Sequence, residues 1–267
     1  VDASPHSRAA LEAAVEMAAR FEAEVLVLFV EDINMLRAAS LPFVQELGIY
    51  SARRRRMRAS EVERHFRARV RQIERLFIRL TDRASIEGTL RVARGIVGTE
   101  IRVAAQEADV LIVGRVGWSQ MRDRQVGSTT LAACCDEVPG VTVVMQEGAR
   151  LSAPVAVVYD GSSASVLGLA IASQLVDALS GPLQVLLLTE DEDELPRFRK
   201  DLNRAMKGVN IVHQSHGVVT TGLPNLVQAI YKLESRTLVL PAALPQIEGE
   251  AVGRLLEQID IPVLLVR

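Results

Sequence analysis

The amino-acid sequence predicts an α/β protein made of two tandem domains, each with a five-stranded parallel sheet flanked by helices. Short runs rich in β-branched residues alternate with stretches of helical periodicity, which is typical of βαβ units. This order repeats along the chain: residues 95–113 align without gaps on residues 222–240, and Asp2-Ala3-Ser4 matches Asp160-Gly161-Ser162. Because each half has a complete set of strands and helices, the repeat indicates a duplicated domain rather than a solenoid.

Strands are expected where short aliphatic runs stand between polar segments. In the first half these runs lie at residues 25–30, 89–93, 110–113 and 141–145, and helices are expected from about residue 7 and at 99–107 and 128–136. In the second half the strands are expected at 154–159, 185–188, 211–219, 238–240 and 262–266, with a helix soon after residue 160. The polar segment 147–152 separates the two predicted domains, residues 1–147 and residues 152–267.

The two predicted domains differ in two places. The second has a full strand before Asp160, whereas the first has only Val1 before Asp2, so we expect the first strand of the first domain to be absent or shortened and a little sequence to precede Val1. The first domain also has an insertion, residues 32–83, in which four consecutive arginines, 53–56, precede a long helical pattern. The arginines could bind phosphates or RNA. No aromatic residues alternate with them, however, and this favours a solvated helical face.

The composition indicates a globular protein and argues against several classes of partner. Of 267 residues, 49% are hydrophobic and 24% are charged, and the net charge of −2 gives no overall attraction to nucleic acid or to an acidic membrane. No apolar run reaches the roughly 18–20 residues that a membrane helix needs. The two cysteines, Cys134 and Cys135, are adjacent and cannot link distant segments, which favours a reducing compartment and therefore the cytoplasm.

A glycine-containing loop follows one strand of the first domain. Its pattern is Gly114-x2-Gly117-x9-Gly127-Ser128-Thr129, and a helix is expected directly after it. Gly114 would leave space for a ligand at the strand end, and Gly117 would allow a positive φ angle. Gly127 would let a phosphate approach the free N–H groups and the positive dipole end of the helix, while Ser128 and Thr129 would add hydroxyl donors. In an open α/β sheet, ligands bind at this edge, beyond the carboxyl ends of the strands.

This loop and its surroundings resemble those of the ATP-binding universal stress proteins. The spacing, the strand before it and the helix after it are similar to the pattern of that family, and Asp2-Ala3-Ser4 resembles the family's N-terminal Asp-Gly-Ser, with Ala3 in place of the usual glycine. The resemblance extends over essentially the whole chain, twice, apart from the insertion. It implies two Rossmann-like domains of the adenine nucleotide alpha hydrolase-like type.

The resemblance also implies a ligand and the residues that bind it. The expected cofactor is ATP, or AMP or ADP, with Mg²⁺ accompanying the nucleotide. By position, Asp2 would contact the nucleoside and Val30 would pack on the adenine. The ribose and the phosphates would be held by Val113, Gly114, Gly117, Gly127, Ser128 and Thr129. The implied function is a nucleotide-binding stress-response regulator without a catalytic residue or a metal ligand of its own.

Three alternatives remain open. The glycines could simply form a tight turn between a strand and a helix. The protein could be a slow ATPase or a phosphate-transfer enzyme, which would need Asp2 or Asp123 to act with a metal ion and a positioned water. It could also be a scaffold, or bind a ligand other than a nucleotide, because a shared fold does not fix a function.

The second predicted domain lacks the loop. Pro241 and Leu244 occupy the positions of Gly114 and Gly117, and Arg254 occupies the position of Ser128. Proline has no N–H group and a fixed φ angle, so this segment cannot form the same phosphate site. We therefore expect a nucleotide only in the first domain.

The other candidates point less clearly to a function. His213 and His216 alternate along a predicted strand without further metal-binding residues at a suitable spacing, and Trp118 could be a lid or a partner contact. The last strands of the two domains, residues 141–145 and 262–266, could pair and cover an exposed sheet edge. Such pairing would give an intramolecular pseudo-dimer, while a homodimer and an unknown protein partner stay open.

Overall fold

The computed structural model describes residues 1–47, 54–117, 126–135, 140–207, 211–219, 222–244 and 251–267. The first half contains, in order, α1 (Pro5–Phe21), β1 (Val25–Asp32), α2 (Ile33–Ser40), β2 (Gln45–Leu47), β3 (Arg54–Arg56), α3 (Ala59–Ala84), β4 (Gly88–Gly95), α4 (Val97–Ala105), β5 (Val110–Gly114), α5 (Ser128–Cys135) and β6 (Val141–Met145). The second half contains β7 (Val155–Tyr159), α6 (Ser163–Leu179), β8 (Leu183–Thr189), the short 3-10 helix η2 (Glu192–Glu194), α7 (Leu195–Ala205), β9 (His213–Val219), α8 (Leu223–Lys232), β10 (Thr237–Pro241), α9 (Ala251–Gln258) and β11 (Val263–Val266).

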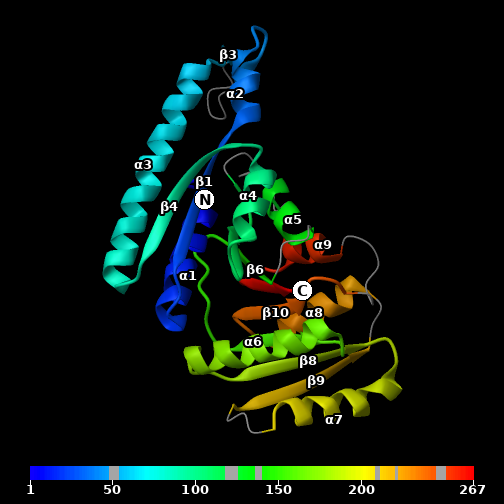
Figure 1. Cartoon of the computed structure of the whole chain (residues 1–267). Coiled ribbons are helices and arrows are strands. Elements are labelled where there is room, and N and C mark those ends of the chain that lie inside the picture. Colours follow the sequence, from blue (N-terminus) through cyan, green and yellow to red (C-terminus); the bar gives the residue numbers. More distant parts are fainter. Residues whose placement is uncertain (48–53, 118–125, 136–139, 208–210, 220–221, 245–250) are drawn as a thin grey trace.

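A seven-stranded sheet joins the two halves of the chain. Its strand order is β5-β6-β11-β10-β7-β8-β9 (Figure 1). The strands of the second half are all parallel to one another, and β6 is antiparallel to β11, with Val144 opposite Val263. The last strands of the two halves therefore pair within one chain, and the sheet continues from one half into the other.

The first half does not form the single five-stranded sheet that the sequence predicts. Its strands are divided: β5 and β6 belong to the large sheet, whereas β1 and β4 form a separate parallel pair. In the second half β7 lies between β8 and β10. Among the described strands, none takes the corresponding place between β1 and β5. The α/β class is confirmed, and the five-stranded parallel sheet is present in the second half only.

The first helix of each half begins with the same local structure. Ser4 and Ser162 are the N-caps of α1 and α6, and their hydroxyls accept hydrogen bonds from the backbone N–H groups three residues later, at 3.2 and 3.1 Å. Both helices have 17 residues. The residue before each cap has a left-handed backbone, with φ of 64° at Ala3 and 80° at Gly161. The sequence match between the two triplets thus corresponds to the same turn in both halves.

Three clusters of buried apolar side chains hold the helices and the sheets together. One contains residues of α1 with residues of β6, β7 and α6, so the two halves share a core. A second lies on the other face of the large sheet beneath α8 and α9. The third joins α1 and β1 to α3 of the insertion, where the rings of Phe29 and Phe66 meet edge to face at 6.1 Å. The insertion is therefore anchored to β1 through its long helix.

The arginine run lies in a strand rather than on a helical face. Arg54–Arg56 form β3, which pairs antiparallel with β2, and the three side chains are exposed. Arg53 lies outside the described residues. The expectation of solvent exposure was correct, but the helical assignment was wrong because the helix begins only at Ala59. Figure 1 shows α2, this hairpin and the start of α3 projecting away from the large sheet.

No helix in the described ranges combines the length and the apolar character of a membrane-spanning segment.

Candidate functional site

All eight residues predicted to bind the nucleotide line one cavity of about 1960 Å³. They come from four separate segments: the residues before α1, the carboxyl end of β1, the end of β5 with its loop, and the start of α5. These residues are Asp2, Val30, Val113, Gly114, Gly117, Gly127, Ser128 and Thr129. The cavity also extends along β1 and β5 toward their first residues. The spacing of the motif in the sequence thus corresponds to one shared surface.

Asp2 joins the turn before α1 to the glycine loop. One carboxylate oxygen, Oδ1, accepts a hydrogen bond from the backbone N–H of Ser4 at 3.0 Å. The other oxygen, Oδ2, lies 2.9 Å from the position that a Cβ atom on Gly117 would occupy. The backbone of Gly117 is not in the left-handed region, so the prediction of a positive φ was wrong. A glycine fits here because the carboxylate of Asp2 approaches its backbone closely.

Gly114 allows the packing of a helix rather than the entry of a ligand. A Cβ atom at this position would lie 2.7 Å from the carbonyl carbon of His6 and 2.8 Å from the backbone nitrogen of Ser7. Because these are backbone atoms of α1, neither can move away cheaply. The prediction that Gly114 leaves room for a ligand therefore gives the wrong reason for this glycine, although its backbone still lines the cavity.

The N–H group of Gly127 is already bonded within the protein. It donates to the carbonyl oxygen of Arg115 at 2.8 Å, which closes the loop on itself. The hydroxyl of Thr130 donates to the carbonyl oxygen of Gly114 at 2.7 Å and fixes α5 to the end of β5. The N–H of Gly127 itself is therefore not among the free N–H groups that the sequence analysis expected at the start of the helix. The first N–H groups of α5 have no partner within the helix, and Ser128 is exposed.

Arg69 of the insertion is a cavity residue that the sequence analysis did not identify. It is half-buried, and burial lowers the pKa of its guanidinium, while the charge of Asp2 acts in the opposite direction. The position of Arg69 on its helix could have identified it as a site residue from the sequence. Val62, Phe66 and Ile73 are buried on one face of α3, and the helical period places Arg69 on this apolar stripe. A charged residue there indicates a polar environment, in this case the cavity.

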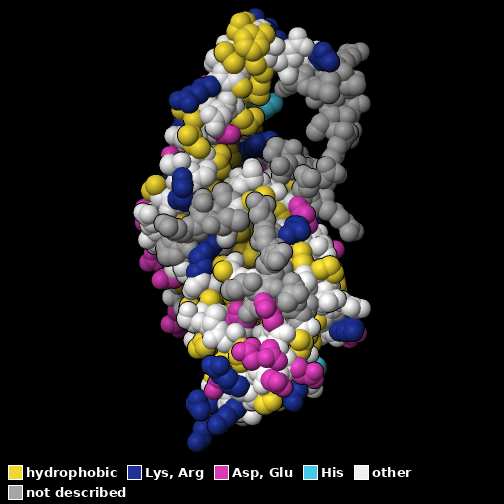
Figure 2. Space-filling model, turned by 90° about the vertical axis from the view of Figure 1, so that its right-hand side faces the viewer, with side chains coloured by type: hydrophobic (Ala, Val, Ile, Leu, Met, Phe, Trp, Pro, Cys, Tyr) yellow, Lys and Arg dark blue, Asp and Glu magenta, His cyan; other side chains and the backbone are white. Residues whose placement is uncertain are grey.

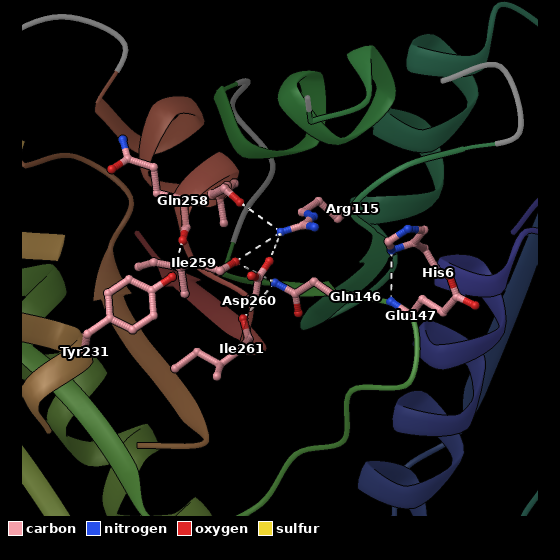
Figure 3. Close-up of polar contacts among 10 residues, drawn as sticks. His6, Arg115, Gln146, Glu147, Tyr231, Gln258, Ile259, Asp260 and Ile261 are labelled. Atoms are coloured by element: carbon pink, nitrogen blue, oxygen red, sulfur yellow. Dashed lines mark hydrogen bonds and ion pairs between the residues drawn. The ribbon is translucent and has the colours of Figure 1, made fainter. Parts of the chain in front are cut away.

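Arg115, inside the glycine loop, points toward the second half of the chain (Figure 3). Its side chain is only 10% exposed, and Nη1 donates to the carbonyl oxygens of Leu256 and Ile259 at 3.3 and 3.1 Å. The same nitrogen lies 3.2 Å from Oδ1 of Asp260. These carbonyls lie at the end of α9, where a helix favours positive charge. The candidate loop is thus connected directly to the last helix of the second half.

The two residues that follow β6 also make polar contacts here, Gln146 with the second half and Glu147 with α1 (Figure 3). Nε2 of Gln146 donates to the carbonyl oxygens of Ile259 and Ile261, at 3.2 and 2.8 Å. The backbone N–H of Glu147 donates to Nδ1 of His6 at 3.0 Å. Burial lowers the pKa of His6, and the positive charge of Arg115 lowers it further, although Glu147 and Asp2 act in the opposite direction. The neutral imidazole is favoured, because Nδ1 must keep its lone pair to accept this bond.

In the described part of the second half, two positions of the glycine loop are occupied by buried side chains. Pro241 is the last residue of β10, and Leu244, which replaces Gly117, is buried in the core with 5% exposure. The ring of Phe198 fills the space beside Gly161, where a Cβ atom would lie 3.0 Å from the ring. The carboxylate of Asp160 accepts hydrogen bonds from the N–H and hydroxyl groups of Ser162, which gives it a structural role.

A smaller and strongly acidic pocket of about 560 Å³ lies at the ends of β7 and β8. It is lined by Asp160, Glu190, Asp191, Glu194 and Asp201, with Arg197 as the one basic residue among its lining residues. Figure 2 shows Asp and Glu side chains gathered on the part of the surface that belongs to the second half. This concentration of negative charge opposes a phosphate group.

The remaining candidates have structural positions or lie outside the described residues. Cys134 is buried in the core. His216 lies 3.0 Å from the side-chain oxygen of Gln184, and within the described part of the chain no three His, Cys, Asp or Glu side chains gather as metal ligands would. Trp118, Asp123 and the side chain of Cys135 lie outside the described residues.

A sequence model of the universal stress protein family matches residues 1–133. The chain belongs to the universal stress protein family. The match spans the whole glycine loop and the start of α5, and it includes all eight residues of the candidate site. No curated protein matches this universal stress protein in sequence.

Solved structures extend the similarity in fold to the second half. This universal stress protein is similar to one from Archaeoglobus fulgidus DSM 4304, with a TM-score of 0.74, 16% identity, and coverage of 99% of this chain and 95% of that chain. It is also similar to a functionally unknown protein from Pseudomonas aeruginosa PAO1, with a TM-score of 0.56, 10% identity, and coverage of 96% and 93%. At these identities the similarity establishes the fold alone.

Proposed function

We propose that this universal stress protein binds an adenine nucleotide in the cavity of its first half and acts as a stress-response regulator. The proposed ligand is ATP, or AMP or ADP, with Mg²⁺ accompanying the phosphates. In this proposal the chain is a tandem protein in which only the first half binds the ligand and the second half has lost the site. The proposed location is the cytoplasm, where adenine nucleotides are abundant.

The single observation that supports this proposal best is the convergence of four distant segments on one cavity. Each segment contributes groups that suit one part of a nucleotide. Val30 offers an apolar surface for the base, Asp2 offers a carboxylate to a ribose hydroxyl, and Val113 lines the part of the cavity proposed for the ribose. The start of α5, with Ser128 and Thr129, offers hydroxyl and N–H donors where a helix favours negative charge.

The surrounding charges support the same choice of site. Arg69 brings a positive charge to the first-half cavity, whereas the second-half pocket is lined by five carboxylates and one arginine. Six carboxylates and two arginines line the whole first-half cavity, but its volume is more than three times larger, so negative charge is less dense there and opposes a polyphosphate less than in the second-half pocket. When bound, the nucleotide would lie against Gly117 and Gly127, and Arg115, between these two glycines and Gly114, links this segment to α9.

Mass spectrometry of small molecules released from the purified, full-length protein tests this proposal. We expect an adenine nucleotide in stoichiometric amount, retained by a protein that releases phosphate from added ATP at no measurable rate. Steady phosphate release would favour a slow ATPase instead. A ligand of another class, or no ligand combined with no thermal shift in millimolar ATP and Mg²⁺, would contradict the proposal.

A further inference from the structure

The charged residues of the chain are distributed unevenly. Residues 32–83, the insertion, contain 13 arginines and 6 acidic residues, which gives this segment a net charge of +7. Since the whole chain has a net charge of −2, the remainder carries −9. The overall charge therefore conceals one strongly basic segment, and α2, the β2–β3 hairpin and the start of α3 within it project away from the large sheet (Figure 1).

The basic character is strongest toward the far end of this projection. Between residues 33 and 60 there are six arginines and one acidic residue. The side chains of Arg37, Arg54–Arg56 and Arg58 are exposed. Arg55 lies 3.5 Å from a carboxylate oxygen of Glu61, and 63% of its side chain is exposed. The end of the projection therefore remains positively charged after this ion pair is taken into account.

Apolar side chains are exposed at the same end. Met35 of α2 is 38% exposed, and Leu41 and Phe43, in the connection between α2 and β2, are 44% and 75% exposed. Phe43 is the most exposed aromatic residue in the described part of the chain. Figure 2 shows hydrophobic side chains gathered at the extreme end of the molecule, with Lys or Arg side chains beside them. A gathering of exposed apolar side chains marks a surface that binds a partner.

The backbone holds the apolar and the basic residues together. The N–H of Met57 donates to the carbonyl oxygen of Val44, the residue after Phe43, at 3.2 Å. The next position continues this contact, because Gln45 pairs with Arg56 in the hairpin. Phe43 is therefore held beside the strand that contains the exposed arginines.

We propose that this end of the insertion docks on a lipid bilayer that contains anionic phospholipids. The docking surface, called here the arm tip, consists of Met35, Leu41 and Phe43 with Arg37, Arg54–Arg56 and Arg58. The guanidinium groups bind the lipid phosphates, with which they can form two parallel hydrogen bonds. The three apolar side chains enter the boundary between the headgroups and the acyl chains.

Two features favour a bilayer over a nucleic acid as the occupant. Met35 and Leu41 are aliphatic, so they offer no ring for stacking on nucleobases, whereas aliphatic side chains suit acyl chains. The arm tip is also the end of a projection, and it can therefore meet a flat surface while the large sheet stays away from it (Figure 1).

Flotation of the purified, full-length protein with lipid vesicles tests this inference. We expect binding to vesicles of phosphatidylglycerol and phosphatidylcholine in equal parts, and at least about tenfold weaker binding to phosphatidylcholine alone. No nucleotide is added, so a failure of this inference is distinct from a failure of the proposed function.

Two variants separate the charged and the apolar contributions of the arm tip. The triple variant Arg54→Gln, Arg56→Gln and Arg58→Gln should bind the anionic vesicles at least about thirtyfold more weakly, because each basic residue near such a surface contributes a factor of about five. Phe43→Ser keeps every charge and should bind at least about tenfold more weakly. All four side chains are exposed, so both variants should keep the melting temperature of the wild type.

The matched control removes the same charge from the shaft of the projection. Arg67, Arg71 and Arg75 are exposed along α3. Arg67 lies eight residues beyond the start of this helix. That separation is about 12 Å, which exceeds the screening length of about 8 Å at physiological ionic strength. We therefore expect the triple variant Arg67→Gln, Arg71→Gln and Arg75→Gln to bind within about threefold of the wild type.

Several results would overturn the inference. These are an absence of vesicle binding, equal losses in the two triple variants, and wild-type binding by Phe43→Ser. Tighter binding to double-stranded RNA, abolished in the α3 variant, would overturn it by assigning the arginines to a nucleic acid. A dimer that Phe43→Ser dissociates in light scattering would also overturn it, because a second copy would then cover the arm tip.

Discussion

Ala3 adopts a left-handed backbone, with φ of 64°, at the position where the second half has Gly161. A residue with a Cβ atom loses about 1–2 kcal/mol in this conformation, and the greater freedom of glycine in the unfolded chain offsets roughly half of the gain from replacing it. We expect Ala3→Gly to stabilise the protein by about 0.5–1 kcal/mol, measured by urea unfolding.

The matched substitution in the second half should act in the opposite direction. Gly161 has φ of 80°, and a Cβ atom there would lie 3.0 Å from the ring of Phe198. Gly161→Ala should therefore destabilise the protein by about 1–3 kcal/mol. If Ala3→Gly lowered stability as well, the shared geometry of the two turns would be contradicted.

His6 should make stability depend on pH. Burial, and then the charge of Arg115, lower its pKa in the folded protein, so the neutral form is favoured there. Its contribution is fully present above the unfolded pKa of about 6.5 and is lost as the pH falls through the lower, folded pKa. We expect the urea midpoint of the wild type to fall more between pH 7.5 and pH 5 than that of His6→Gln, in which no imidazole can charge. Equal falls would exclude this role.

For the three glycines of the loop, the sequence predicted where they lie but not why each position needs a glycine. The spacing of Gly114, Gly117 and Gly127 predicted a shared surface, because a strand, a loop and a helix in that order place these residues together. The reason for each glycine was not predictable. It depends on how closely α1 and Asp2 approach the loop, and that approach is a tertiary contact between distant segments.

At the scale of the elements, local pattern predicted most helices and strands of both halves. The strand at Val141–Met145 has the predicted bounds, and β5 and β10 extend the predicted strands by one or two residues. The β2–β3 hairpin was missed, because consecutive arginines have neither helical nor strand periodicity and because pairing with Gln45–Leu47 defines β3. Arg69 and Arg115 were also missed as site and junction residues, since their partners lie far away in sequence.

Arg115 should stabilise the junction at the end of α9 far more than its acidic partner Asp260 does. Arg115 is buried and donates to two carbonyl oxygens, whereas the side chain of Asp260 is 64% exposed. We expect Arg115→Met to destabilise the protein by about 2–3 kcal/mol and Asp260→Asn by less than about 0.5 kcal/mol. Similar losses in urea unfolding would mean that the ion pair, rather than the bonds to the helix end, stabilises the junction.

The insertion helix should contribute to ligand affinity through Arg69. If the nucleotide binds between Asp2 and the start of α5, removing this positive charge should weaken ATP binding by about tenfold, or 1.4 kcal/mol. Arg67→Gln is the matched control, because Arg67 is exposed on the same helix and does not line the cavity. Calorimetric titration of Arg69→Gln and Arg67→Gln compares them, and equal affinities would exclude a role for Arg69 in binding.

At the scale of the whole molecule, the two halves form one continuous structure. The pairing of β6 with β11 and the core shared by α1 and α6 join them. The repeat in the sequence predicted that the last strands could pair. The division of the first-half strands was not predicted; it follows because no described strand lies between β1 and β5.

The central claim is that the start of α5 binds the phosphates of a nucleotide. Ser128→Asp places a carboxylate on an exposed residue at this helix start. Negative charge there favours the helix, so the fold is retained, but it repels a phosphate. Ser128→Asn has nearly the same shape without the charge. In a calorimetric titration with ATP and Mg²⁺, we expect Ser128→Asp to weaken binding by at least about tenfold and Ser128→Asn to stay within about threefold of the wild type. Wild-type affinity in Ser128→Asp, or no binding by the unmodified protein, would contradict the claim.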